Sequence, residues 1–211
     1  MKYRIDSIIE DVRKHIDEIG QNESELVGSE DNAELRIIAV EKLRQAIDVV
    51  RGSVKIETLS DCDIAHKEAG TVAVCDNYVS VRVPDDLVRF VKAHKSDWAH
   101  DVYEVFAANS EEAFKAQDEF VGATIYNPVV VADREDNKNV YKLYGRTEEA
   151  APSIYVEYVP HAQIENNLVE FGGKMYDAIV LYTSMLLLAT YNEQTRLQLM
   201  TEQYKAIMTN L

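Results

Sequence analysis

The chain has 211 residues, of which 46% are hydrophobic and 28% are charged, as in an ordinary globular protein. The formal net charge is −15, and the acidic residues are spread along the chain and form no tail. Such a surface repels nucleic acid, so it argues against a protein that grips phosphates or reads a base sequence.

The N-terminal part predicts two helices joined as a hairpin. Apolar residues recur at helical spacing over residues 5–19, and Gly20 follows as a stop signal. A second stripe covers residues 35–50 and ends at Gly52. The polar, turn-rich stretch 21–32 lies between the two stripes, and a connection of this size lets two helices pack side by side.

After Ser53 the helical pattern gives way to short β-rich runs, several of which alternate as half-buried strands do. The runs are residues 54–56, 71–74, 78–83, 102–106, 128–131, 140–144 and 154–159. Residues 75–77 indicate a hairpin turn, and residues 133–139 indicate a solvated loop between strands. This part of the chain therefore predicts an antiparallel β-rich region.

Two short helices are expected to interrupt these strands. One begins at Pro84-Asp85-Asp86, because a proline and two acidic residues suit the first turn of a helix, and it would direct Leu87, Phe90 and Val91 inward. The other follows Ser110, a good N-cap residue.

The longest apolar run lies between Met175 and Ala189, after the Gly172-Gly173 pair. A helix that is apolar nearly all round must be buried on most sides, and this run is too short for a bilayer, which needs about 20 residues. After Tyr191-Asn192 the pattern becomes amphipathic. The apolar stripe there consists of Leu197, Met200, Tyr204 and Met208. We expect this stripe to dock on a neighbouring subunit, and the alternative is that it folds back on its own chain.

These elements predict an α+β fold: a helical bundle formed by the N- and C-terminal helices, with an inserted antiparallel β-rich domain. The expected domains are an N-terminal helix hairpin over residues 1–52, the β-rich insertion over residues 53–165, and the C-terminal bundle helices over residues 166–211.

The search for catalytic chemistry starts from the two cysteines. A nucleophile could form if Cys62 or Cys75 met His66, His94 or His100, but such pairings arise easily by chance. A zinc site would need the same residues, and their spacing fits no usual ligand pattern. Because nothing near the N-terminus resembles a signal peptide, we expect two reduced thiols.

Other motifs point away from enzymes. Residues 133–144 start like a calcium loop, yet Lys138 stands where glycine is required and Tyr144 where glutamate is required. The chain has no glycine-rich phosphate loop, no Gly-x-Ser-x-Gly and no His-Glu-x-x-His. Trp98 is expected to anchor a core, with an interface hot spot as the alternative. We therefore predict no catalytic residue, no cofactor and no metal.

One series of motifs resembles a known family. In chain order it comprises Tyr78 to Phe90 with Pro84-Asp85-Asp86 inside it, Asp97-Trp98, Val102-Tyr103-Glu104, Gln117, Pro128-Val129 and Val140 to Tyr144. This order resembles the ring proteins of the head-to-tail connector in crAss-like phages of Bacteroides, in which a strand ends in Leu-Pro-Asp-Asp-Phe-Leu. The resemblance covers residues 5–50 and 78–205. Val83 and Leu87 depart mildly from the pattern, and residues 53–77 match nothing.

The resemblance implies a structural virion protein without catalytic residues, made in the host cytoplasm and placed at the portal vertex. It implies a homo-oligomeric ring, a dodecamer, with the portal protein and neighbouring ring or tail proteins as partners and no membrane. Genomic DNA would pass nearby without specific binding, which a negatively charged lumen favours. The alternatives are a cysteine- or metal-dependent hydrolase and an acidic binding module, such as an inhibitor that mimics DNA.

Overall fold

The computed structural model describes the chain except residues 20–32, 76, 119, 146–151 and 191–192. Helices and antiparallel or mixed sheets are both present, so the predicted α+β class is confirmed. The chain divides into two compact units: a helical unit, Met1–Asp63 with His161–Leu211, and a β-rich unit, Ile64–Pro160. The expected domain boundaries at residues 52/53 and 165/166 stay a prediction.

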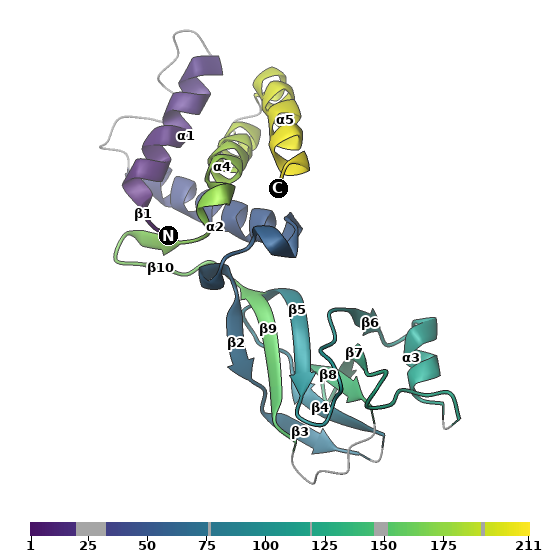
Figure 1. The fold of residues 1–211 in the computed structure, drawn as a ribbon. Helices are drawn as coiled ribbons and strands as arrows, with labels where there is room; N and C mark the ends of the chain where they lie inside the picture. Colours follow the sequence, from purple (N-terminus) through teal and green to yellow (C-terminus); the bar gives the residue numbers. More distant parts are fainter. Residues whose placement is uncertain (20–32, 76, 119, 146–151, 191–192) are drawn as a thin grey trace. The chain divides into compact units, whose positions relative to one another are not determined.

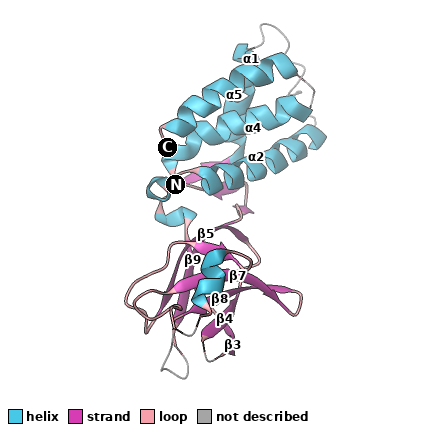
Figure 2. Ribbon diagram, turned by 90° about the vertical axis from the view of Figure 1, so that its right-hand side faces the viewer, coloured by secondary structure: helices cyan, strands magenta, loops and turns pink. Residues whose placement is uncertain are grey.

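The helical unit is built around one apolar helix. Its long helices are α1 (Ile5–Ile19), α2 (Ala33–Ser53), α4 (Tyr176–Thr190) and α5 (Gln194–Thr209). Helix α4 packs against α1, α2 and α5, and Figure 2 shows it between α5 and α2. Because α4 is apolar nearly all round, it needs neighbours on several sides. The classification of these helices as a bundle stays a prediction.

Polar groups inside α4 are satisfied locally. The buried hydroxyl groups of Thr183 and Ser184 donate hydrogen bonds to the carbonyl oxygens of Ile179 and Val180, at 2.7 and 2.9 Å. Each hydroxyl thus uses the carbonyl group one turn earlier, which allows it to sit in an apolar core without a separate partner.

A small sheet and short 3₁₀ helices complete this unit. The strands are β1 (Lys2–Arg4), β10 (Ile164–Glu165) and β11 (Leu168–Glu170), in the order β1-β11-β10 with antiparallel pairing. The 3₁₀ helices are η1 (Ile56–Thr58), η2 (Asp61–Asp63) and η3 (Gly173–Met175). The strand expected over residues 54–56 is therefore wrong, because the chain turns there into η1.

Two sheets form the β-rich unit over its described residues. The first has the order β2-β9-β5, from β2 (Ala65–Glu68), β9 (Ile154–Pro160) and β5 (Leu87–Lys95), all antiparallel. The second has the order β3-β4-β8-β7-β6, from β3 (Thr71–Val74), β4 (Tyr78–Arg82), β8 (Lys138–Tyr144), β7 (Val129–Glu135) and β6 (Val105–Ala107). Residues of both sheets share one apolar core, which includes Val81, Leu143 and Val156.

The helix expected after Pro84 is wrong. Residues Leu87–Lys95 form strand β5, paired with β9 over its whole length. The acidic residues after Pro84 lie in a turn, in which the Leu87 N–H donates to the Pro84 carbonyl oxygen at 3.2 Å. Valine and phenylalanine favour strands, and pairing with β9 outweighs the helix-start signal. Strand β2 was not predicted at all.

Other local expectations are settled by hydrogen bonds. Helix α3 (Glu111–Ala116) is confirmed, and the Ser110 hydroxyl accepts from the Ala113 N–H at 3.1 Å as an N-cap. The loop expected over residues 133–139 is mostly strand, because β7 and β8 meet in a tight turn at Asp136-Asn137 with φ of 49° and 62°. Aspartate and asparagine tolerate such left-handed backbone better than other side chains.

Candidate functional site

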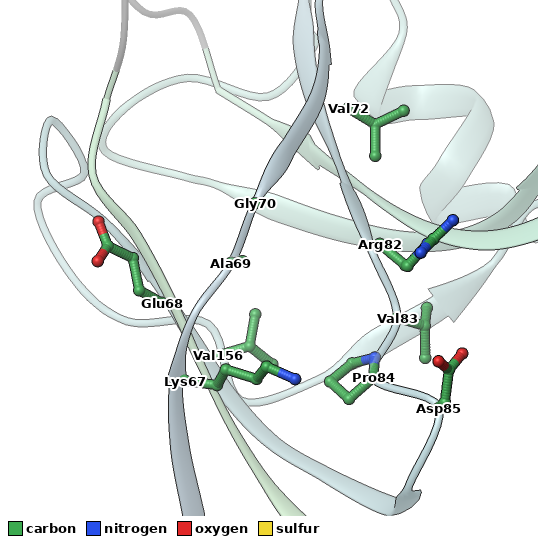
Figure 3. Close-up of a pocket in the computed structure, with 10 residues that line it drawn as sticks. All are labelled: Lys67, Glu68, Ala69, Gly70, Val72, Arg82, Val83, Pro84, Asp85 and Val156. Carbon is green, nitrogen blue, oxygen red and sulfur yellow. The ribbon is translucent and has the colours of Figure 1, made fainter.

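The β-rich unit contains a pocket of about 390 Å³ beside the end of strand β4 (Figure 3). Its lining comes from β2, the β2–β3 turn, β3, β4 and its following turn, and β9. The lining residues are Lys67, Glu68, Ala69, Gly70, Val72, Arg82, Val83, Pro84, Asp85 and Val156. A pocket of this size is in the range of concave sites that bind small ligands or single side chains.

The pocket has a mixed lining of apolar and charged side chains. Val72, Val83 and Val156 supply apolar surface, and Val156 is buried while Val72 is 56% exposed. In Figure 3 the Lys67 ammonium group points toward Pro84, across the pocket. Such a surface suits an apolar side chain on an acidic partner segment.

The charges that line the pocket are mixed: two bases, Lys67 and Arg82, and two acids. Glu68 and Asp85 also line the pocket, and in Figure 3 the Glu68 carboxylate points away from the other lining side chains. Within the described part of the chain, neither Lys67 nor Arg82 takes part in an ion pair. Glu68 and Asp85 take part in no ion pair among these described residues either, so Lys67, whose ammonium group points across the pocket, is the cation placed to meet an outside carboxylate.

Backbone pairing fixes the pocket walls. Lys67 of β2 lies opposite Val156 of β9, and Arg82 of β4 lies opposite Val140 of β8. Pro84 has no N–H group to continue the ladder, so β4 ends there and the chain turns away. The pocket is therefore part of the sheet framework.

A second surface of the same unit is apolar and exposed. We call Phe120 and Val121 the knob: their exposed fractions are 94% and 79%. Phe114, Tyr103 and Tyr126 of the same stretch are also more than half exposed. Large apolar side chains left in solvent in one segment mark an interaction site more often than scattered ones do.

Hydrogen bonds from the backbone of the knob to the side chain of Asp118 hold the knob in place. The carboxylate Oδ1 of Asp118 accepts hydrogen bonds from the N–H groups of Phe120 and Val121, at 2.8 and 3.0 Å, and these bonds lower the pKa of Asp118. A Cβ atom on Gly122 would lie 2.1 Å from the Asp118 carbonyl oxygen. The close approach of the backbone at Gly122 to the backbone at Asp118 therefore requires glycine. The Ala123 N–H also donates to the Ala116 carbonyl oxygen. The backbone N–H groups of the two exposed residues are thus both hydrogen-bonded.

A polar cluster lies around a second hollow, of about 300 Å³, on the β2-β9-β5 sheet. His66 Nδ1 lies 3.1 Å from Glu157, and His94 Nδ1 lies 2.8 Å from Asp101. Lys92 bridges the two carboxylates at 3.0 and 3.3 Å. Burial raises the pKa of Asp101, but hydrogen bonds from Lys92 and His94 outweigh it and lower that pKa overall. The cluster is a hydrogen-bonded network, and the described residues that line the hollow include no cysteine, serine or threonine.

The thiol chemistry that the sequence left open as an alternative is not assembled among the described residues. Both cysteines are free thiols. Cys62 Sγ lies 3.1 Å from Ser60 Oγ and 3.5 Å from the N-terminal amine of Met1. Among the described residues, no hydrogen bond joins Cys62 or Cys75 to a histidine, and no group of three or more His, Cys, Asp or Glu side chains could hold a metal ion.

The predicted interface residues of α5 pack on their own chain. Met200 is completely buried in the core of the helical unit, and Tyr204 lies against Tyr182 with ring centroids 5.0 Å apart. Met208 packs against the same core, and Leu197 is half-buried. The alternative that the sequence left open, a helix folded back on its own subunit, describes this arrangement, because α4 needs cover on that side.

Trp98 lies in the core of the β-rich unit, only 5% exposed. The Lys95 ammonium group sits 5.6 Å from its ring centroid and is itself fully buried. That ammonium group donates to Gly145 O at 3.0 Å and lies 2.8 Å from Asp97 Oδ1. Trp98 therefore anchors a core instead of offering a contact surface.

Sequence reasoning missed both the pocket and the knob. The pocket depends on β2, which the sequence did not predict, and on a turn that was taken for a helix. The knob did leave a signal: Phe120, Val121 and Tyr126 lie close together in a stretch with neither helical nor strand periodicity. Apolar residues without a periodic pattern have no predicted core to enter.

Neither protein-family models nor curated protein sequences yield a match to this chain. Within the described residues, no helix has the length and apolarity that crossing a bilayer requires. The features that bear on function are therefore the pocket and the knob of the β-rich unit, together with the motifs in the sequence.

Proposed function

We propose that this chain is a structural virion protein, a ring subunit of the head-to-tail connector below the portal of a crAss-like phage. The observation that carries the proposal is the knob, in which the side chains of Phe120 and Val121 are exposed while their backbone N–H groups donate to Asp118. Exposed apolar side chains gathered in one place are rare on monomeric proteins, and they commonly mark the contact surfaces of subunits that assemble.

The charge of the chain supports the same function. A ring below the portal forms part of the conduit for the genome, and a net charge of −15 favours passage of DNA without adhesion. The partners we propose are further copies of the chain in a ring, which the resemblance suggests is a dodecamer, together with the portal protein and neighbouring tail proteins. The proposed role involves no catalysis and no cofactor.

Mass spectrometry and electron cryomicroscopy of purified particles test the proposal. In virions of a phage that encodes the chain, we expect stoichiometric copies and density for the β-rich unit in a ring at the portal vertex. Particles assembled without the chain should be heads whose assembly stops before the tail attaches. Absence of the chain from mature virions, or its presence in substoichiometric amounts away from the vertex, would contradict the proposal.

A further inference from the structure

The knob and the pocket lie at opposite ends of the second sheet. Asn77, just before β4, lines a hollow together with Asp118 and Phe120, whereas Arg82 and Pro84 at the other end of β4 line the pocket. A five-residue strand separates the two ends by roughly 15 Å. One β-rich unit can therefore use both surfaces at once.

The two surfaces are also carried by different elements of that unit. Strand β3, which carries Val72 of the pocket, is one edge strand, and β6 is the other. Helix α3, which leads into the knob, packs on β6 and β7 (Figure 1). A contact that joins one surface to the other is consequently a head-to-tail contact between copies.

The two surfaces are complementary in chemistry. The knob supplies two exposed apolar side chains, and the pocket supplies apolar surface around a volume of about 390 Å³. The exposed Asp118 lies next to the knob, whereas Lys67 and Arg82 line the pocket together with Glu68 and Asp85, none of the four in an ion pair among the described residues. The Lys67 ammonium group, which points across the pocket in Figure 3, is the cation that an arriving acidic segment would meet.

We propose that the knob of one copy inserts into the pocket of the next copy, with a second copy of this chain as the occupant. The contact is heterologous, because different surfaces of the two copies meet, and repetition of such a contact closes into a ring when the rotation per copy allows it. Closure of the ring rests on the proposed function, whereas the pairwise contact does not.

Mixing two variants of the full chain tests the contact. A knob variant carries Phe120→Asp and Val121→Asp, and a pocket variant carries Lys67→Glu and Val72→Asp. All four side chains are exposed, so both variants should keep the wild-type circular dichroism and melting curves. Ile37→Asp is the matched control, since Ile37 is 66% exposed on α2 of the helical unit.

Analytical ultracentrifugation and mass photometry measure the association. We expect concentration-dependent oligomers for the wild type and for the control, and association at least about tenfold weaker for each variant alone. The mixture of the two variants should give dimers and nothing larger, because each pair retains one intact knob and one intact pocket.

Several results would overturn the contact. The first is a wild-type chain that stays monomeric at the highest concentration reached, and the second is a knob variant that assembles like the wild type. The third is a mixture of the two variants that gives no dimer. A two-fold symmetric contact or a different protein partner would produce such results. If the chain is found in the connector of virions but the knob variant still assembles, the proposed function stands and the knob-to-pocket contact is wrong. If association depends on the knob but the chain is absent from virions, the contact stands and the proposed function is wrong.

Discussion

The helical unit and the β-rich unit treat their apolar side chains differently. Among the described residues, the exposed large apolar side chains of the helical unit are scattered: Met1, Ile37, Leu168 and Leu199. Those of the β-rich unit are gathered on one edge strand and in one stretch: Val72, Val74, Tyr103, Phe114, Phe120, Val121 and Tyr126. Single exposed apolar residues are normal, whereas such gathering indicates contact with another molecule. We infer that the helical unit is complete by itself and that the β-rich unit is built to meet a partner.

This difference corrects a natural inference from amphipathic helices. A terminal helix with an apolar stripe has the pattern of a docking element, and α5 has that stripe in Leu197, Met200, Tyr204 and Met208. In the structure most of the stripe covers α4, which is apolar on the side that α5 occupies. A stripe in the sequence shows that a helix needs a neighbour, but it does not show whether that neighbour belongs to the same chain.

Removal of α5 should have the largest effect. Truncation after Asn192 takes away Met200 and Tyr204 and exposes the side of α4 that they cover. We expect the helical unit to lose its cooperative melting transition while the β-rich unit melts as in the full chain, which calorimetry and hydrogen exchange can separate. A truncated chain with an intact helical transition that fails only to assemble would restore α5 as a docking element.

Breaking the buried ion pair of the helical unit should come next. Asp63 is fully buried and accepts hydrogen bonds from Ser60 N at 3.0 Å and Gly172 N at 3.0 Å, with Arg51 Nε at 3.2 Å. Burial lowers the pKa of Arg51, and Asp63 opposes that shift. Asp63→Ala leaves this guanidinium group without its carboxylate, so we expect a loss of about 3–5 kcal/mol in urea denaturation of the helical unit.

The neighbouring Asp61 provides the control for this measurement. Its side chain is exposed, so Asp61→Ala should change the free energy of unfolding by less than about 0.5 kcal/mol. Equal effects of Asp61→Ala and Asp63→Ala would show that the buried pair contributes nothing special to the helical unit.

The smallest effect is a pH dependence of the β-rich unit. A hydrogen bond from Lys142 lowers the pKa of Asp133 in the folded state. The resulting stabilisation is complete above the ordinary aspartate pKa of about 3.9 and is lost as the pH falls through the lower folded-state value. Asp133→Asn should therefore flatten the loss of stability of this unit below about pH 4, by about 1 kcal/mol or less.

Asp136→Asn is the matched control, because asparagine also tolerates the positive φ of 49° at this turn position. We expect the thermal melting of this variant to follow the wild-type pH profile. A profile for Asp133→Asn that coincides with the wild type over the acid range would show that the Lys142 contact is not coupled to folding.

Much of the fold could be predicted because strong periodic patterns come from burial within one element. The stripes at residues 5–19 and 35–50 and the apolar run that forms α4 gave the helices, and Ser110 gave the start of α3. Strand β5 could not be predicted, since its pairing with β9 lies about 65 residues away in the chain and overrides the local signal at Pro84. The pocket was missed for the same reason, because distant strands build its walls.

Hydrogen–deuterium exchange on assembled and monomeric chain tests the central claim most directly, which is that the β-rich unit carries the contact surface. The assembled sample is the wild type, and the monomeric sample is the knob variant Phe120→Asp with Val121→Asp. We predict that assembly slows exchange over residues 120–126, 67–72 and 82–85, while Gln194–Thr209 of α5 exchanges equally in both samples. Slower exchange confined to α5, with no change at the knob or the pocket, would contradict the account.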